Sequence, residues 1–195
     1  MKIKIITLGC KVNMYESEYI KESFIKNGDL IVNENADVVI INTCSVTNQA
    51  DAKSRKMIRR SKNENPKAII VVCGCMSENH QNDIKDLDID ILIGSKDKSR
   101  IVDLVKQYIL DNKKITKFYD LNNISFEDMF ITNFSDKTRA FVKIEDGCNN
   151  FCTYCTIPYV RGRERSKDFN EVIKEINFLV ENGYKEIVLT GIHTG

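Results

Sequence analysis

The sequence predicts an α/β protein in which helices cover both faces of an open parallel sheet. Short, continuous apolar segments recur along the first half of the chain, as in residues 37–41 (DVVII) and 68–72 (AIIVV). Such segments are typical of strands that are buried on both faces. Segments of helical length separate them. Strands that alternate with helices in this way form βαβ units, and these units build a parallel sheet.

The elements of the sheet follow one another in a regular order. Residues 2–8 (KIKIITL) form the first expected strand. The helix after it, residues 14–27, has Ile20 and Phe24 one turn apart and ends at Gly28. The further elements are expected at 37–41 (strand), 52–63 (helix), 68–72 (strand), 89–93 (strand) and 101–109 (helix). They predict a first domain over residues 1–120.

A connector without a clear period, residues 121–136, leads to a second unit, expected at residues 137–195. This unit contains an expected strand at 139–144, an amphipathic helix at 168–182 and a strand at 186–190. A piece with two strands and one helix is not a closed domain. We therefore expect the second domain to be incomplete.

Composition limits the function classes. The 195 residues carry a net charge of +1, so the chain as a whole does not attract polyanions, and a local patch would be needed. No apolar run approaches the roughly 20 residues of a membrane-spanning helix, so we expect no membrane partner. Seven cysteines without a secretion signal indicate a cytoplasmic protein. In such a protein they favour metal binding or redox chemistry over disulfides.

Three cysteines form a tight group directly after the strand at 139–144. Cys148, Cys152 and Cys155, called here the loop cysteines, have C-x₃-C-x₂-C spacing. Thiolates hold iron–sulfur clusters, and a four-iron cluster normally takes four of them. Three thiolates leave one iron open to a small molecule. The alternatives are a zinc site, for which His193 is the only later fourth ligand, and inert core cysteines.

Three further cysteines each follow an expected strand of the first domain. These strand-end cysteines are Cys10, Cys44 and Cys75. Ligand sites of open parallel sheets form beyond the carboxyl ends of the strands, so we expect the three to converge. The alternative is that small buried thiols simply end strands. Cys73 lies two residues before Cys75 and would share a face with it in a strand. We interpret Cys73 as a core residue.

Five segments together resemble the motifs of the radical SAM methylthiotransferase family. They are TLGCKVN (7–13), NTCSVT (42–47), GC (74–75), GCNNFCTYCTIP (147–158) and RGRERS (161–166). The resemblance spans nearly the whole chain. It implies an N-terminal methylthiotransferase domain with a Rossmann- or flavodoxin-like sheet, followed by the first βα units of a radical SAM barrel.

The resemblance also implies the cofactors and their sites. Two [4Fe–4S] clusters are implied, one on the loop cysteines, where S-adenosylmethionine is cleaved, and one on the strand-end cysteines, where sulfur is handled. In the family, an aromatic residue at the position of Tyr154 borders the adenine of S-adenosylmethionine. A glycine at the position of Gly191 lies beside its amino group. The alternative for Tyr154 is a partly buried loop aromatic.

The motifs are most similar to the branch of the family that acts on N6-threonylcarbamoyladenosine beside the tRNA anticodon. Residues 53–55 (KSR) and 190–195 (TGIHTG) add to this similarity. It implies insertion of sulfur and a methyl group at C2 of the adenine, with tRNA, an electron donor and a sulfur source as partners. The alternatives are isopentenyladenosine in tRNA, a ribosomal protein, or an inactive iron–sulfur fragment or RNA-binding module.

Basic residues cluster at two places. Arg161, Arg163 and Arg165 follow the loop cysteines, where they either contact tRNA or a cofactor carboxylate or form structural ion pairs. Six more lie on or beside the helix at 52–63: Lys53, Arg55, Lys56, Arg59, Arg60 and Lys62. They either meet phosphates or form a solvated helix face.

Overall fold

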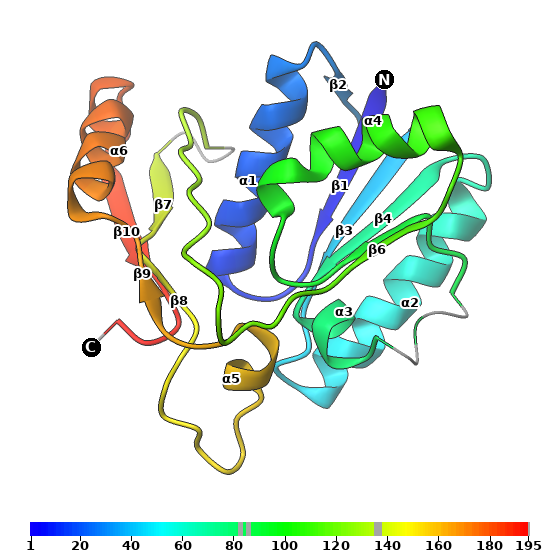
Figure 1. Cartoon of the computed structure of the whole chain (residues 1–195). Coiled ribbons are helices and arrows are strands. Elements are labelled where there is room, and N and C mark those ends of the chain that lie inside the picture. Colours follow the sequence, from blue (N-terminus) through cyan, green and yellow to red (C-terminus); the bar gives the residue numbers. More distant parts are fainter. Residues whose placement is uncertain (82–83, 85–86, 135–137, 195) are drawn as a thin grey trace.

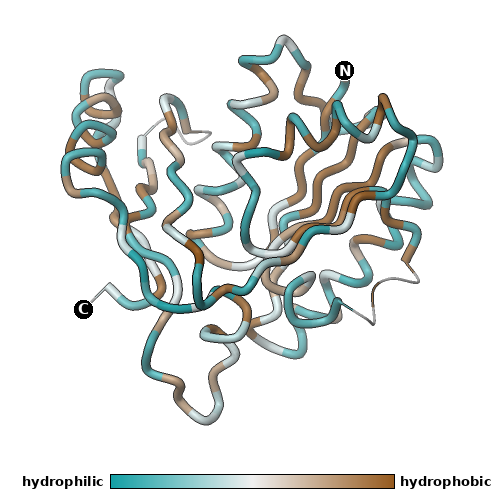
Figure 2. The backbone as a smooth tube through the Cα atoms, viewed as in Figure 1, coloured by the Kyte–Doolittle hydropathy of each residue, from teal (hydrophilic) through white to brown (hydrophobic). Residues whose placement is uncertain are grey.

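Six parallel strands form one sheet in the order β2-β1-β3-β4-β5-β6 (Figure 1). The computed structural model describes residues 1–81, 84, 87–134 and 138–194. The strands are β1 (Lys2–Thr7), β2 (Leu30–Ile31), β3 (Val38–Thr43), β4 (Ile69–Gly74), β5 (Ile91–Ile93) and β6 (Ile115–Lys117). The central strand β3 is buried along its whole length. This burial explains its unbroken apolar run, which Figure 2 shows in brown with its neighbours.

Helices cover both faces of this sheet. On one face, α1 (Lys11–Lys26) and α4 (Ile101–Asp111) contribute Phe24 and Leu104 to a buried cluster with side chains of β1, β3, β4 and β5. On the other face, α2 (Asn48–Glu64) and α3 (Cys75–Asn79) contribute Ile58 and Met76 to a second cluster. A short 3₁₀ helix, η1 (Lys98–Arg100), precedes α4. The predicted doubly covered parallel sheet is therefore confirmed.

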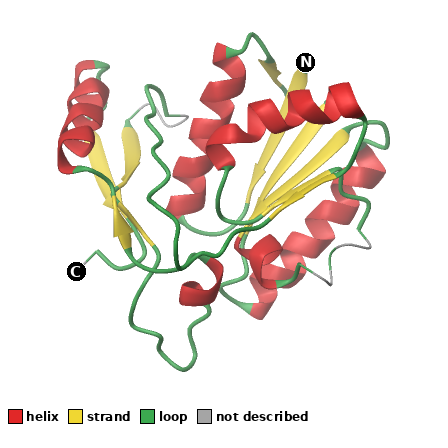
Figure 3. Cartoon of the chain, in the orientation of Figure 1, coloured by secondary structure: helices red, strands yellow, loops and turns green. Residues whose placement is uncertain are grey.

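The C-terminal unit contains a second, smaller sheet (Figure 3). Its strands β7 (Arg139–Lys143) and β10 (Glu186–Thr190) pair directly in parallel. The helix α6 (Phe169–Glu181) lies between them in the sequence. Two short strands, β8 (Glu145–Asp146) and β9 (Arg165–Ser166), pair in antiparallel orientation. The segment of chain that connects them contains the short helix α5 (Ile157–Val160). The predicted strand–helix–strand piece is confirmed. We call the segment from β7 to β10 the C-terminal unit.

The connector contains no helix or strand within residues 121–134. Met129 and Ile131 from this segment are buried with Tyr15 of α1 and Phe141 of β7, so the connector fills the space between α1 and the C-terminal unit. The last two residues of the expected connector, 135 and 136, lie outside the described residues, as does the start of the second domain at residue 137. The domain boundaries expected at 120 and 136 therefore stay predictions. No helix in the described part of the chain is long and apolar enough to cross a membrane.

Cys75 directly follows a strand, as predicted. The strand β4 continues to Gly74, two residues beyond its expected end, and Cys75 begins α3, so Cys73 and Cys75 do not share a strand face. Gly74 has a φ of 102°, and a Cβ there would lie 2.5 Å from the Thr43 carbonyl oxygen. The left-handed backbone at this glycine turns the chain, so the two thiols separate. Cys73 packs in the core, as predicted, with no solvent exposure.

Candidate functional site

The three strand-end cysteines lie in the wall of one cavity. This cavity has a volume of about 350 Å³. Cys10, Cys44 and Cys75 line it from the N-terminal sheet, and Arg161 and Gly191 line it from the C-terminal unit. The carboxyl ends of β1, β3 and β4 meet at this edge, as the topology predicted. We call this space the shared cavity, because both parts of the chain form its wall.

Local backbone geometry brings the thiols to this edge. Gly9 has a φ of 97°, and a Cβ at this position would lie 2.7 Å from the Cys44 Sγ. Only glycine allows the β1 end to approach Cys44 this closely. Asn13, fully buried in α1, donates to the carbonyl oxygens of Leu8 at 2.7 Å and Thr43 at 2.9 Å. It thereby holds the ends of β1 and β3 together.

The strand-end cysteines differ in exposure. Cys10 is exposed, whereas Cys44 and Cys75 are buried. Burial raises the pKa of Cys75, and the nearby Arg161 and Lys98 cations oppose this effect. Among the described residues, no three histidine, cysteine, aspartate or glutamate side chains converge on a point for a single metal ion. A four-iron cluster binds each thiolate through a different iron, and three thiols around one cavity supply a donor set of this kind.

Arg161 is fully buried beside this cavity. Its Nη1 donates to Glu16 Oε1 at 2.9 Å and to Asp146 Oδ1 at 3.0 Å, and its Nη2 donates to Asn13 Oδ1. Lys143 Nζ donates to the same two carboxylates, at 2.8 and 2.7 Å. The guanidinium therefore joins α1 of the N-terminal sheet to β8 of the C-terminal unit.

Two further cations complete this group. Lys98 Nζ lies 3.1 Å from Glu16 Oε2, and Arg165 donates to Asp146 Oδ2 at 3.1 Å. The buried charge network thus consists of Glu16, Lys98, Lys143, Asp146, Arg161 and Arg165. Burial alone would raise the pKa of Glu16, but Arg161, Lys143 and Lys98 outweigh it and hold that pKa well below its usual range.

The loop cysteines follow β8 on a segment that extends away from both sheets, drawn in yellow in Figure 1. Cys148 is buried, Cys155 is half-buried and Cys152 is exposed. The Asn150 backbone N–H donates to the Cys148 Sγ at 3.5 Å. The Cys155 N–H donates to the Cys152 carbonyl at 2.9 Å, forming a tight turn. Three cysteines on one loop supply the donor set that an iron–sulfur cluster with one open iron uses.

The turn after β10 is fixed by a residue that the sequence did not single out. Glu145 Oε2 accepts the backbone N–H groups of Ile192 at 2.5 Å and His193 at 2.8 Å. A Cβ on Gly191 would lie 2.7 Å from this oxygen, so no side chain fits there. Burial raises the pKa of Glu145. Tyr154, by contrast, is 91% exposed and lies on the cluster loop. Its expected contact with adenine stays a prediction.

The other two arginines after the loop have different surroundings. Arg163 is exposed, with its guanidinium 4.4 Å from the Phe151 ring centroid and a 3.2 Å hydrogen bond to Asn122. Arg165 donates to the carbonyl oxygens of Arg161 and Arg163 as well as to Asp146. The sequence left two alternatives open for Arg161, Arg163 and Arg165, namely contact with tRNA or a cofactor carboxylate, or structural ion pairs. In this structure Arg161 and Arg165 form structural ion pairs, and Arg163 has a cation–π contact at the surface.

The basic residues of α2 are partly paired. Arg60 bonds Glu64 at 2.6 Å on the exposed face of the helix, and Lys62 lies 2.9 Å from Asp88. Arg55 pairs with Asp51 at 3.0 Å. These contacts agree with a solvated helix face, and a phosphate contact of this helix stays a prediction.

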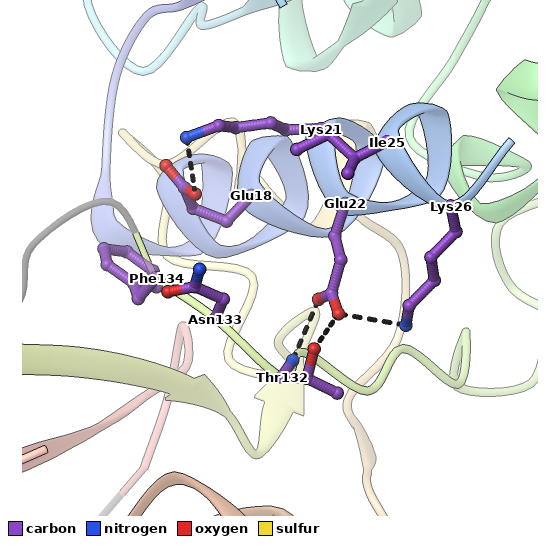
Figure 4. Close-up of a pocket in the computed structure, with 8 residues that line it drawn as sticks. All are labelled: Glu18, Lys21, Glu22, Ile25, Lys26, Thr132, Asn133 and Phe134. Carbon is purple, nitrogen blue, oxygen red and sulfur yellow. Dashed lines mark hydrogen bonds and ion pairs between the residues drawn. The ribbon is translucent and has the colours of Figure 1, made fainter. Parts of the chain in front are cut away.

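A second cavity, of about 470 Å³, lies between α1 and the connector. Figure 4 shows the Glu22 side chain of α1 pointing toward Thr132. The Thr132 backbone N–H and hydroxyl both donate to the Glu22 carboxylate. Lys26 pairs with the same carboxylate, with an N–O distance of 2.9 Å. Its charged side chains bond to one another and to the connector. We interpret this groove as the seam that attaches the connector to α1.

Comparison with known proteins places both parts of the chain. Residues 2–94 match the model of the uncharacterized protein family UPF0004, and residues 142–194 match that of the radical SAM superfamily. The chain is 45% identical to the threonylcarbamoyladenosine tRNA methylthiotransferase MtaB of Bacillus subtilis, over 97% of this chain and 43% of that protein. The chain belongs to the radical SAM methylthiotransferase family.

Other members of the family are similar over the same range. Identity is 38% to the MtaB of Thermotoga maritima, over 99% of this chain and 44% of that protein. It is 37% to the tRNA-2-methylthio-N(6)-dimethylallyladenosine synthase of Clostridium tetani, over 96% of this chain and 43% of that protein. The chain thus spans less than half the length of these relatives. Membership of the radical SAM superfamily implies S-adenosylmethionine and a [4Fe–4S] cluster.

Proposed function

We propose that the protein containing this chain is a cytoplasmic tRNA methylthiotransferase that inserts sulfur and a methyl group at C2 of N6-threonylcarbamoyladenosine beside the anticodon. Its partners are tRNA, an electron donor and a sulfur source. The relatives with the higher identities carry names of this activity. The observation that carries the proposal is the shared cavity, whose wall contains the strand-end cysteines and the Gly191 turn together.

The shared cavity supports a division of labour between two sites. In the proposal, the loop cysteines hold the cluster that binds S-adenosylmethionine, and Gly191 lies beside the amino group of that cofactor. The strand-end cysteines hold a second [4Fe–4S] cluster. Together these groups supply one-electron chemistry for a carbon that no side-chain base can deprotonate. Gly191 and the strand-end cysteines line one space, which supports a reaction that uses both sites.

The side chains of the chain have separate tasks in this arrangement. The three strand-end thiolates bind their cluster, and Asn13 holds two of the strand ends that carry them. Glu145 orients the turn at Gly191 through two backbone N–H groups. Ile157 and Val46 contribute apolar surface to the cavity wall and reduce the access of water.

Anaerobic reconstitution with iron and sulfide tests the two-site part of this proposal. We expect about eight irons per chain, four for each cluster. Replacing all three loop cysteines by alanine should leave about four, and replacing the strand-end cysteines should leave a different four. About four irons in the unsubstituted protein, or bound zinc in place of iron, would contradict the proposal.

Mass spectrometry of tRNA nucleosides tests the substrate. A deletion strain should lose the 2-methylthio derivative of N6-threonylcarbamoyladenosine and regain it when the gene is restored. The runner-up substrate is dimethylallyladenosine, which is favoured by the 37% identity to a synthase of its methylthio derivative. If the deletion strain instead loses the 2-methylthio derivative of dimethylallyladenosine, dimethylallyladenosine is the substrate. If neither nucleoside changes, a tRNA substrate is excluded, and a ribosomal protein becomes the target to examine.

A further inference from the structure

Arg161 has one hydrogen-bond donor that the described part of the chain leaves unused. Its Nη1 and Nη2 groups bond Glu16, Asp146 and Asn13. Its Nε is buried and has no hydrogen-bond partner among the described residues. A buried donor on a charged group is costly when it is unsatisfied, and such donors in native proteins usually serve a ligand or a function.

The position of this donor points to its acceptor. Arg161 lines the shared cavity with Cys10, Cys44 and Cys75, which are the thiols among the described lining residues. Of these, Cys75 interacts electrostatically with the Arg161 guanidinium. The same side chain is locked in place by contacts from α1 and β8. It cannot turn toward solvent without breaking its hydrogen bonds to Glu16 and Asp146. A guanidinium fixed in this way is preorganised to bind an anion inside the cavity.

The charge of the surroundings leads to the same acceptor. The buried charge network contains the cations Lys98, Lys143, Arg161 and Arg165 and the carboxylates Glu16 and Asp146. Within this network the cations outnumber the carboxylates, and the Arg165 side chain is 11% exposed. The carboxylates of Glu127 and Glu145 act on Lys98 and Asp146 from outside the network. Buried charge of one sign is strongly unfavourable unless an opposite charge neutralises it. Thiolates bound to iron, and the sulfides of a cluster, supply negative charge at this wall.

We propose that the Arg161 Nε–H donates a hydrogen bond to a sulfur atom of the group held by the strand-end cysteines, and that the buried charge network balances the negative charge of that group. This inference rests on the proposed second cluster. Hydrogen bonds to sulfur and nearby positive charge make a cluster easier to reduce. Arg161 therefore sets the reduction potential of the second cluster as well as joining the two parts of the chain.

The test uses the intact protein with Cys148, Cys152 and Cys155 replaced by alanine, which keeps only the second cluster. In this parent, Arg161→Lys retains the charge and removes the guanidinium, and Arg161→Gln removes both. Lys143→Met is the matched control, because Lys143 bonds the same two carboxylates but is not among the described residues that line the cavity. Iron content, thermal unfolding and the midpoint potential, followed by electron paramagnetic resonance, are measured for each variant.

We expect all variants that fold to bind about four irons per chain. The midpoint potential should fall in Arg161→Lys and fall further in Arg161→Gln, with a smaller shift in Lys143→Met. An unchanged potential in both Arg161 variants, or equal shifts in Arg161→Gln and Lys143→Met, would overturn the assignment of Arg161 while leaving the second cluster in place. A parent without iron would overturn the second cluster and this inference together. If Arg161→Gln does not fold, Arg161→Lys decides.

Discussion

Arg161 and Glu16 lie 145 residues apart in the sequence, and their side chains meet at 2.9 Å without exposure to solvent. One belongs to the segment after the loop cysteines and the other to the first helix. Lys98 and Lys143 share the same carboxylate. Because a buried charge without its partner is strongly destabilising, this carboxylate holds the two parts of the chain in one arrangement.

Removing this carboxylate should destabilise the protein. We expect Glu16→Gln to lower the free energy of unfolding by about 3–5 kcal/mol, because three buried cations lose a shared partner. Urea denaturation of the intact protein measures this change. Arg60→Ala, which breaks the exposed pair with Glu64, is the control and should change the free energy of unfolding far less. Similar costs for the two variants would contradict the central position of Glu16.

Stability should also depend on pH through Glu16 and Asp146. Burial acts to raise the pKa of both carboxyls, but the surrounding cations outweigh it and lower both pKa values. The folded protein therefore favours the charged form more than the unfolded chain does. The stabilisation is complete above the unfolded pKa of about 4 and is lost as the pH falls further. Urea denaturation between pH 7 and pH 3 should show this loss, and Glu16→Gln should reduce it.

The strand-end cysteines and Cys73 should behave differently. Replacing Cys44 or Cys75 by alanine should remove about four irons per chain after reconstitution. Cys73→Ala should leave the iron content unchanged, because burial raises the pKa of this thiol to about 12 and the side chain packs in the core. Iron and sulfide assays provide the comparison. A loss of iron in Cys73→Ala, at unchanged folding by circular dichroism, contradicts the assignment.

Gly74 and Gly183 offer a matched pair for the role of the turn before Cys75. Both have a positive φ, at 102° and 92°. A Cβ at Gly74 would lie 2.5 Å from the Thr43 carbonyl oxygen, whereas a Cβ at Gly183 would meet nothing within 4 Å. Gly183→Ala should cost about 1–2 kcal/mol from backbone strain alone. Gly74→Ala should cost clearly more and should also reduce iron binding. Equal free energies of unfolding would contradict the steric argument.

Glu145 should affect the binding of S-adenosylmethionine without touching the clusters. Glu145→Ala removes the acceptor for two backbone N–H groups of the turn after Gly191. We expect the affinity for S-adenosylmethionine to fall about tenfold, equal to about 1.4 kcal/mol, measured by isothermal titration calorimetry. Glu164→Ala, at a nearby exposed carboxylate, should leave it unchanged. An unchanged affinity in Glu145→Ala, with full iron content, contradicts this role.

The sequence was most informative where burial leaves a continuous pattern. The apolar runs at 37–41 and 68–72 predicted two central strands, and their order along the chain predicted that Cys10, Cys44 and Cys75 would meet. Both follow from general rules of parallel sheets, since every strand carboxyl end lies at one edge. The helix at 101–109 was evident because its apolar residues recur with helical spacing.

Other features left no periodic signal. Strands as short as β8 and β9 contain two residues each, which is too few for an alternation to be recognised. The pairing of Arg161 with Glu16 joins distant single residues, so no local pattern indicates it. The separation of Cys73 from Cys75 depends on the φ of Gly74, a backbone angle that no sequence pattern indicates. Glu145 was missed because its partners are backbone groups.

Because the wall of the shared cavity is divided between the two parts of the chain, the two parts are not interchangeable modules. In a chimaera that takes residues 2–94 from a relative, the incoming segment would have to supply both an amide at position 13 and a carboxylate at position 16 for the resident Arg161. Substitutions at these three positions are therefore expected to occur together in evolution. We therefore expect the two parts of the chain to be inherited together.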